Sequence, residues 1–195
     1  MAVTAVVFDV GETLVDETGM WERTADAAGV PRFTLMGVLG GLAARGQPHK
    51  NVWKILGVEW PASTWDPVDF YADALPCLAR LRSRGLLVGA VGNTPADTED
   101  LLREHVDIVR SSGRWGVEKP AREFFERMVA EAECEPREVA YVGDRVDDDV
   151  VPALQAGLVA IHIRRGPWGY LQDGADRAHA QIASLDELPE AFRGL

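Results

Sequence analysis

The sequence predicts an α/β protein with a doubly wound parallel sheet and a small helical cap inserted after the first strand. The run Val3–Phe8 is apolar and rich in β-branched residues, which is typical of a buried strand. From about residue 71 onward, similar apolar runs alternate with helical segments. This alternation favours right-handed crossovers and a parallel sheet covered on both faces. We expect the core at residues 1–16 and 71–195 and the cap at residues 17–70.

The expected cap has helical pieces separated by glycine and proline, and no strand-like period. Its helices are expected at Met20–Ala28, Thr34–Arg45 and His49–Leu56, followed by a loop at Gly57–Asp69. Tryptophans are frequent here, and we expect them to fill a small apolar core of the cap rather than line a pocket: Trp21, Trp53, Trp60 and Trp65.

The expected core continues with a helix at Asp73–Arg84, whose apolar residues recur at helical spacing and which Gly85 ends. The next elements are a strand at Leu86–Val91, a helix capped by Asn93-Thr94-Pro95 that runs to about His105, a strand at Asp107–Val109, a loop to Lys119-Pro120, and a helix at Arg122–Ala132. The last ones are a strand at Val139–Val142, a helix at Asp147–Ala156, a strand at Leu158–Ile163, a loop at Gly166–Gly174, a strand at Ala180–Ala183 and a short helix.

Composition and charge limit the function classes. The 195 residues are 47% hydrophobic and 26% charged, which fits one globular domain with a modest insertion. The net charge of −11 argues against nucleic acids and anionic membranes as partners, because both require clustered cations. A small anionic substrate is compatible with this charge where a metal ion and a few cations act locally. The chain has no long apolar run and enters a strand without a basic leader, so we expect a cytoplasmic protein. The sequence leaves open whether it is a monomer or a homodimer.

Two acidic positions follow apolar strands. Asp9 ends the first strand, at the edge where open α/β sheets place ligands, and a buried carboxylate there requires a cation or backbone N–H donors. Asp144 follows a later strand and opens a segment with four acids in six residues, which repel one another unless a divalent cation lies among them. A hard cation such as Mg²⁺ binds carboxylates of this kind. The alternatives are an acid that caps a turn and a solvated acidic loop.

Basic residues occur at two points of interest. Lys119 precedes Pro120, which positions it just before a helix. A lysine at such a place can neutralise a transferring phosphoryl group or keep a nucleophilic carboxylate ionised, and the alternative is an ordinary exposed cation. Arg164 and Arg165 follow the last long strand, at the same edge of the sheet. Either could contact an anion there, although exposed charge after a strand is the expectation.

These segments together resemble the motifs of the haloacid dehalogenase superfamily, whose members are mostly phosphohydrolases. The family's first motif, an apolar strand followed by Asp-x-Asp-x-Thr, is similar to Asp9-Val10-Gly11-Glu12-Thr13 except at its second acid. The third motif, a lysine before a proline, is similar to Lys119-Pro120. The fourth, Gly-Asp followed by a further Asp, is similar to Gly143-Asp144 and Asp149. The resemblance implies a Rossmann-like core with residues 17–70 in the place of a small helical cap.

The resemblance also implies an activity, namely Mg²⁺-dependent hydrolysis of a small phosphorylated metabolite, a phosphate monoester, through an aspartyl phosphate on Asp9. It implies three sets of site residues: metal ligands (Asp9, the carbonyl of Gly11, Asp144), catalytic or phosphate-binding residues (Asp9, Lys119, Asn93, Thr94) and supporting residues (Thr13, Asp149).

Two departures from the family pattern leave alternatives open. Gly11 replaces the second acid, which protonates the leaving group, so about 10²–10⁴-fold of general acid–base assistance is at stake. Glu12 is adjacent, but its side chain leaves the backbone one position late. Gly92 replaces the Ser or Thr of the second motif. The alternatives are a protein that binds a phosphorylated ligand with little or no turnover, a haloacid hydrolase, and a phosphonate hydrolase that uses Lys50 or Lys54.

Overall fold

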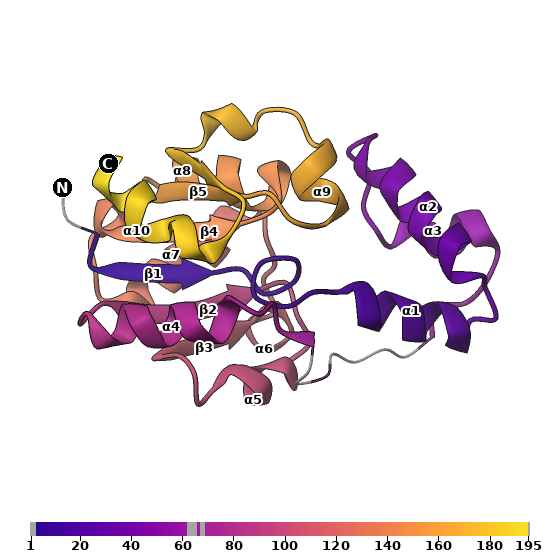
Figure 1. Ribbon diagram of the computed structural model, residues 1–195, viewed down its shortest axis with the longest axis horizontal. Coiled ribbons are helices and arrows are strands. Elements are labelled where there is room, and N and C mark those ends of the chain that lie inside the picture. The colour runs from indigo at the N-terminus through magenta and orange to yellow at the C-terminus, as the bar shows by residue number, and fades with distance from the viewer. Residues whose placement is uncertain (1–2, 62–65, 67–68, 195) are drawn as a thin grey trace.

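The computed structural model describes residues 3–61, 66 and 69–194, so the expected loop Gly57–Asp69 is described only in part. Six strands form one sheet in the order β3-β2-β1-β4-β5-β6, and every neighbouring pair is parallel. Helices cover both faces of this sheet, and β1 lies in its middle (Figure 1). The predicted doubly wound α/β fold is confirmed.

The strands are β1 (Ala5–Phe8), β2 (Leu87–Gly92), β3 (Ile108–Ser111), β4 (Val139–Gly143), β5 (Val159–Ile163) and β6 (Ala180–Ile182). The helices that follow β1 are α1 (Thr18–Ala27), α2 (Arg32–Ala43) and α3 (Asn51–Leu56). The other helices are α4 (Ala74–Ser83), α5 (Thr98–Leu102), α6 (Ser112–Trp115), α7 (Arg122–Ala132), α8 (Val151–Gln155), α9 (Gly166–Leu171) and α10 (Leu188–Ala191), with a π-helical turn at Val146–Val150 before α8. None of the described helices combines the length and the hydrophobicity that a membrane-spanning segment requires.

Each face of the sheet has its own apolar core, and β1 contributes to both. Val6 and Phe8 pack with α4 and the C-terminal segment, whereas Ala5 and Val7 pack with α7 and α8. All four side chains are fully buried. A strand buried on both faces is apolar throughout, which explains the unbroken apolar run that opens the sequence.

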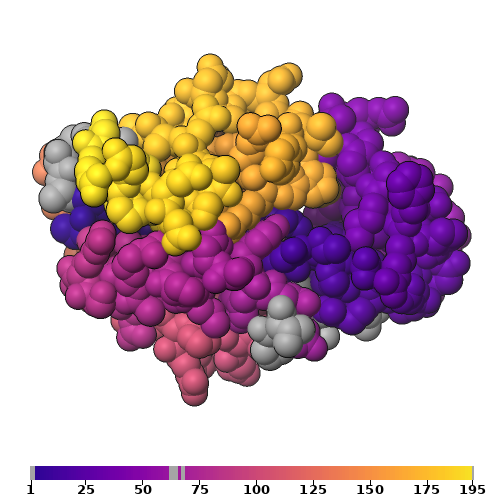
Figure 2. Space-filling view, in the orientation of Figure 1, coloured from indigo at the N-terminus to yellow at the C-terminus, as the bar shows by residue number. Residues whose placement is uncertain are grey.

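Helices α1 to α3 form a separate lobe, which we call the helical insert (Figures 1 and 2). Their buried apolar side chains form a third cluster, apart from the two at the sheet. Trp168 of α9 belongs to the same cluster, so the insert packs against the sheet domain at this helix. Trp21 and Trp53 are buried as expected, whereas Trp60 is 53% exposed and Trp65 lies outside the described residues. The exact limits of the cap, residues 17–70, stay a prediction.

The prediction of a loop at Gly166–Gly174 is wrong over its first part, because α9 forms there. Pro167 fits the first turn of a helix, and Trp168 is 6% exposed against the insert. Packing against a segment far away in sequence stabilises this helix. The local composition, rich in glycine, does not indicate that packing.

The helix after β2 also differs from its prediction, since α5 begins later and ends earlier than expected. The N–H of Thr94 donates to the carbonyl of Gly92, and the carbonyl of Thr94 accepts the N–H of Gly113, both at 3.0 Å. These bonds hold the segment in a turn, so Asp97 and not Thr94 takes the capping position.

Two further segments differ in detail. The helix predicted at Asp147–Ala156 begins as the π-helical turn Val146–Val150 and continues as α8. The carbonyl of Arg145 accepts the N–H groups of both Asp149 and Val150 at 3.1 Å, which widens this turn. The loop expected after β3 begins with the one-turn helix α6.

Candidate active site

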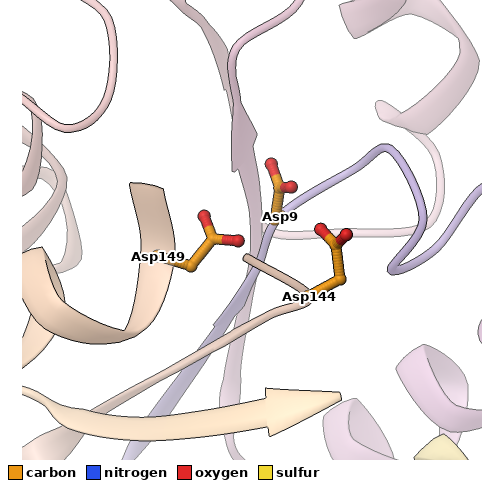
Figure 3. A group of neighbouring side chains, drawn as sticks. All are labelled: Asp9, Asp144 and Asp149. Carbon is orange, nitrogen blue, oxygen red and sulfur yellow. The ribbon is translucent and has the colours of Figure 1, made fainter. Parts of the chain in front are cut away.

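Asp9 and Asp144 follow directly on two neighbouring strands. Because β1 and β4 pair in parallel, with Phe8 opposite Val142, their carboxyl ends lie together. The strand order reverses between β1 and β4, which is where open sheets of this kind bind ligands. The carboxylate oxygens of Asp9, Asp144 and Asp149 lie within 4.8 Å of one another and face a common space (Figure 3).

Lys119 balances two of these carboxylates. Its Nζ lies 2.6 Å from Oδ1 of Asp9 and donates to Oδ1 of Asp149 at 2.5 Å. Its side chain is almost fully buried above the ring of Tyr141, so it is not an exposed surface cation. Burial opposes its charge, but Asp149 and Asp9 raise the pKa of Lys119 well above the usual lysine value. The ammonium group is therefore charged at neutral pH.

The π-helical turn holds Asp149 in place. Oδ2 of Asp149 accepts the backbone N–H of Arg145 at 2.9 Å, while Oδ1 bonds to Lys119. A Cβ atom at Gly143 would overlap the carboxyl group of Asp149, so this position requires glycine. The turn thus points one acid of the run inward and leaves the two preceding acids paired with the guanidinium of Arg145.

These acids fit a divalent cation. Burial, together with Asp149 and Asp9, raises the pKa of Asp144 well above the usual carboxyl value. Burial also raises the pKa of Asp9 to about 6, against the opposing effect of Lys119. The single charge of Lys119 does not balance three buried carboxylates. Oxygen ligands at this spacing are those that a hard cation such as Mg²⁺ takes, so the residues present fit a Mg²⁺ site.

The loop after β2 lies beside Asp9 and is tied to Lys119. The backbone N–H of Lys119 donates to Oδ1 of Asn93 at 2.8 Å, and Nδ2 of Asn93 donates to the carbonyl of Lys119 at 3.0 Å. A Cβ atom at Gly92 would lie 2.6 Å from Oδ1 of Asp9 and 3.2 Å from Cγ2 of Val10. A serine or threonine at this position would therefore have to displace the carboxylate of Asp9 from its present place.

The three remaining predicted site residues, Gly11, Thr13 and Thr94, differ from one another in their relation to the cavity. Gly11 lines the same cavity as Asp9. Thr13 is fully buried, its carbonyl accepts a hydrogen bond from Nη1 of Arg165 at 2.7 Å, and its hydroxyl has no partner among the described residues. Thr94 is buried and does not belong to the described cavity lining. The geometry therefore does not group Thr94 with Asp9.

A cavity of about 800 Å³ lies between the sheet edge and the helical insert. Asp9 and Lys119 line it from the core, and Trp21 and Trp60 line it from the insert. Both indoles thus reach the cavity, which differs from the expectation that the tryptophans only fill the core of the cap. Lys50 also lines it, whereas the described lining does not include Lys54. This volume accommodates a small metabolite.

Comparison with known families identifies the family of this chain. A family model described as haloacid dehalogenase-like hydrolase matches residues 3–157. The chain belongs to this hydrolase family. The match begins before β1 and extends beyond Asp149, so it includes all the site residues discussed above.

Individual relatives in the hydrolase family are named phosphatases. The chain is 31% identical over 131 residues to a glyceraldehyde 3-phosphate phosphatase of Methanocaldococcus jannaschii, covering 64% of this chain and 57% of that protein. It is 37% identical over 105 residues to the enzyme of the same name from Methanopyrus kandleri, covering 50% and 45%. The chain thus spans about half the length of these two relatives. The chain also resembles the crystal structure of a HAD phosphatase from Thermococcus onnurineus, to which it is 22% identical. The match covers 100% of this chain and 99% of that one, and its TM-score of 0.67 shows a shared fold.

The structure also places residues that sequence reasoning missed. Glu17 lines the cavity, and its Oε2 accepts the indole N–H of Trp21 at 3.0 Å. The spacing of these two residues, one helical turn apart, is the only sequence feature that indicates their contact. Arg165 was expected to be exposed but is buried, because it pairs with Asp73 and stacks 4.0 Å above the ring of Tyr71. Its partners are far away in sequence, so no local pattern predicts this burial.

Proposed function

We propose that this chain is a Mg²⁺-dependent phosphohydrolase that cleaves small phosphate monoesters through an aspartyl phosphate on Asp9. One observation carries this proposal: Asp9, Asp144 and Asp149 converge with Lys119, and Asp9, Asp144 and Lys119 line a cavity of about 800 Å³. Membership of the hydrolase family and the phosphatase names of its relatives support the same activity.

Asp9 is the proposed nucleophile. Its proximity to Lys119 favours the ionised carboxylate, so that with a pKa of about 6 most of the group is charged at neutral pH. The carboxylate attacks phosphorus, the bond to the leaving alcohol breaks, and an aspartyl phosphate forms. Water then attacks phosphorus and releases inorganic phosphate, which restores Asp9.

The remaining residues bind and orient the phosphoryl group. Asp9, Asp144 and the carbonyl of Gly11 would hold Mg²⁺, which supplies charge neutralisation at the phosphoryl oxygens when bound. Both carboxyl oxygens of Asp149 are already hydrogen-bonded, so Asp149 acts by holding Lys119. Asn93 positions the backbone of Lys119 and retains one amide hydrogen for a phosphate oxygen.

Phosphate release from p-nitrophenyl phosphate tests this proposal. We expect turnover by the wild type with MgCl₂, loss of that turnover with EDTA, and at least a 10³-fold lower kcat for Asp9→Asn, which removes the nucleophile. Asp97→Asn is the matched control, because Asp97 is an exposed acid that lines the same cavity and does not belong to the group of Asp9, Asp144 and Asp149. Absence of wild-type turnover, or equal turnover by Asp9→Asn, would refute the activity.

A further inference from the structure

Gly11 leaves the proposed reaction without the acid that the family uses to protonate the leaving group, and the neighbouring Glu12 is fully engaged elsewhere. Oε1 of Glu12 accepts the backbone N–H of Glu17 at 3.1 Å, and its Oε2 accepts the hydroxyl of Tyr71 at 2.5 Å. A Cβ atom at Gly166 would lie 2.5 Å from Cγ of Glu12, so this side chain also has little room to move. Glu12 therefore serves to hold the turn between β1 and α1.

Glu17 is placed differently. It stands at the start of α1, on the segment that connects the sheet edge with the helical insert. Like Glu12, it lines the same cavity as Asp9 and Gly11, but only one of its carboxyl oxygens is engaged by a described residue. The indole N–H of Trp21 donates to Oε2 of Glu17. The backbone N–H of Glu17 donates to Oε1 of Glu12, which fixes the backbone at this point. This arrangement orients the carboxyl group and leaves its Oε1 without a hydrogen-bond partner among the described residues.

We propose that Glu17 is the general acid and base of this enzyme, in the place of the carboxylate missing at Gly11; this rests on the phosphohydrolase function proposed above. In the first step Asp9 attacks phosphorus, the bond from phosphorus to the leaving oxygen breaks, and the protonated carboxyl of Glu17 gives its proton to that oxygen. In the second step water attacks the aspartyl phosphate, its proton goes to the Glu17 carboxylate, and the bond from phosphorus to Asp9 breaks. One ester and one water thus give one alcohol and one phosphate, and Glu17 regains its proton.

The surroundings of Glu17 favour this role. Burial, together with the negative charges of Glu12 and Asp9, raises the pKa of Glu17 to about 8, although the N–H of Trp21 and the charge of Arg145 act in the opposite direction. The carboxyl group therefore carries a proton at neutral pH, as a general acid must.

Two substrates of nearly the same shape separate this role from a structural one. The leaving group of p-nitrophenyl phosphate is a stable phenolate that departs without a proton, whereas that of p-nitrobenzyl phosphate is an alkoxide that needs one. We expect Glu17→Gln to lower kcat/KM for the benzyl ester by about 10²–10⁴-fold and for the phenyl ester by less than about tenfold. The wild-type kcat/KM for the benzyl ester should fall above about pH 8, and Glu17→Gln should remove that fall.

Glu22→Gln is the matched control, since Glu22 lies on the same helix, pairs with Arg32 and is outside the described cavity lining. It should leave both substrates unchanged. A kcat/KM for the phenyl ester within about tenfold of the wild type shows that Glu17→Gln is folded. Equal losses for the two esters, no loss for either, or a wild type that cleaves only the phenyl ester would overturn the role of Glu17 but not the phosphohydrolase function. A wild type that does not cleave the phenyl ester overturns the phosphohydrolase function itself.

Discussion

Nζ of Lys119 and Oδ1 of Asp149 lie 2.5 Å apart, and both side chains are almost fully buried. The other oxygen of Asp149 accepts the backbone N–H of Arg145, so this carboxylate is held from two sides. The pair directs the ammonium group of Lys119 toward Asp9. Since removal of one member of a buried ion pair leaves the other charge poorly compensated, the pair links the stability of the fold to the geometry of the site.

Asp149→Asn is predicted to weaken both stability and turnover. We expect the free energy of unfolding in urea to fall by about 3 kcal/mol, because Lys119 loses a buried partner, and kcat to fall by at least about tenfold. Asp147→Asn is the control, because Asp147 lies in the same turn but forms a more exposed pair with Arg145. Its effect on stability should stay within about 1 kcal/mol. Equal effects of the two substitutions would contradict the prediction.

Asp144→Asn is predicted to abolish the response to Mg²⁺. The wild type should gain about 2.7 kcal/mol of stability at a Mg²⁺ concentration of 100 Kd, and the variant should gain nothing at that concentration. In EDTA the variant should be at least as stable as the wild type, because one of three crowded carboxylates has become neutral. Thermal unfolding with and without MgCl₂ measures both effects. A shift in the variant as large as that of the wild type would show that the ion binds elsewhere.

Glu17 is predicted to make stability depend on pH. Its pKa is raised from 4.5 to about 8 by burial and by Glu12, so the folded state binds a proton more tightly than the unfolded state. This stabilisation is fully present below pH 4.5 and is lost as the pH rises from 4.5 to about 8. Urea unfolding of metal-free protein across that range should show the decline, and Glu17→Gln should flatten its upper part. Parallel curves for the two proteins would contradict the raised pKa.

Gly92→Ser, which restores the residue type usual in the family, is predicted to impair this protein. The new side chain would press on Oδ1 of Asp9, so we expect a loss of about 1–3 kcal/mol in stability and of at least about tenfold in kcat/KM. Gly40→Ser is the control, because a Cβ atom at Gly40 in α2 meets nothing within 4 Å. Urea unfolding and p-nitrophenyl phosphate turnover test both variants. A gain in activity for Gly92→Ser would contradict the prediction, because it would show that the side chain of Asp9 moves aside at little cost.

Much of the sheet and the chemistry could be predicted from the sequence. A strand buried on both faces must be apolar, so β1 and β4 stand out as apolar runs, and the residue after each run lies at the edge where ligands bind. Asp9 and Asp144 follow from that rule, and the structure brings them together as expected. Predictions for α5 and α9 were less accurate, because hydrogen bonds of Thr94 and burial of Trp168 outweigh local preference there.

Residue patterns along the chain are enough to predict the alternation of strands and helices, the family, and the acids and the lysine that meet at the sheet edge, because periodicity and strand ends are local properties of the chain. Which charged side chains are buried, and where they point, depends on the folded arrangement of distant segments. Arg165 reaches the carbonyl of Thr13 across 152 positions of sequence, and Glu17 enters the cavity because α1 folds against the turn of Glu12. Burial and pKa depend on such distant neighbours, and no local pattern contains them.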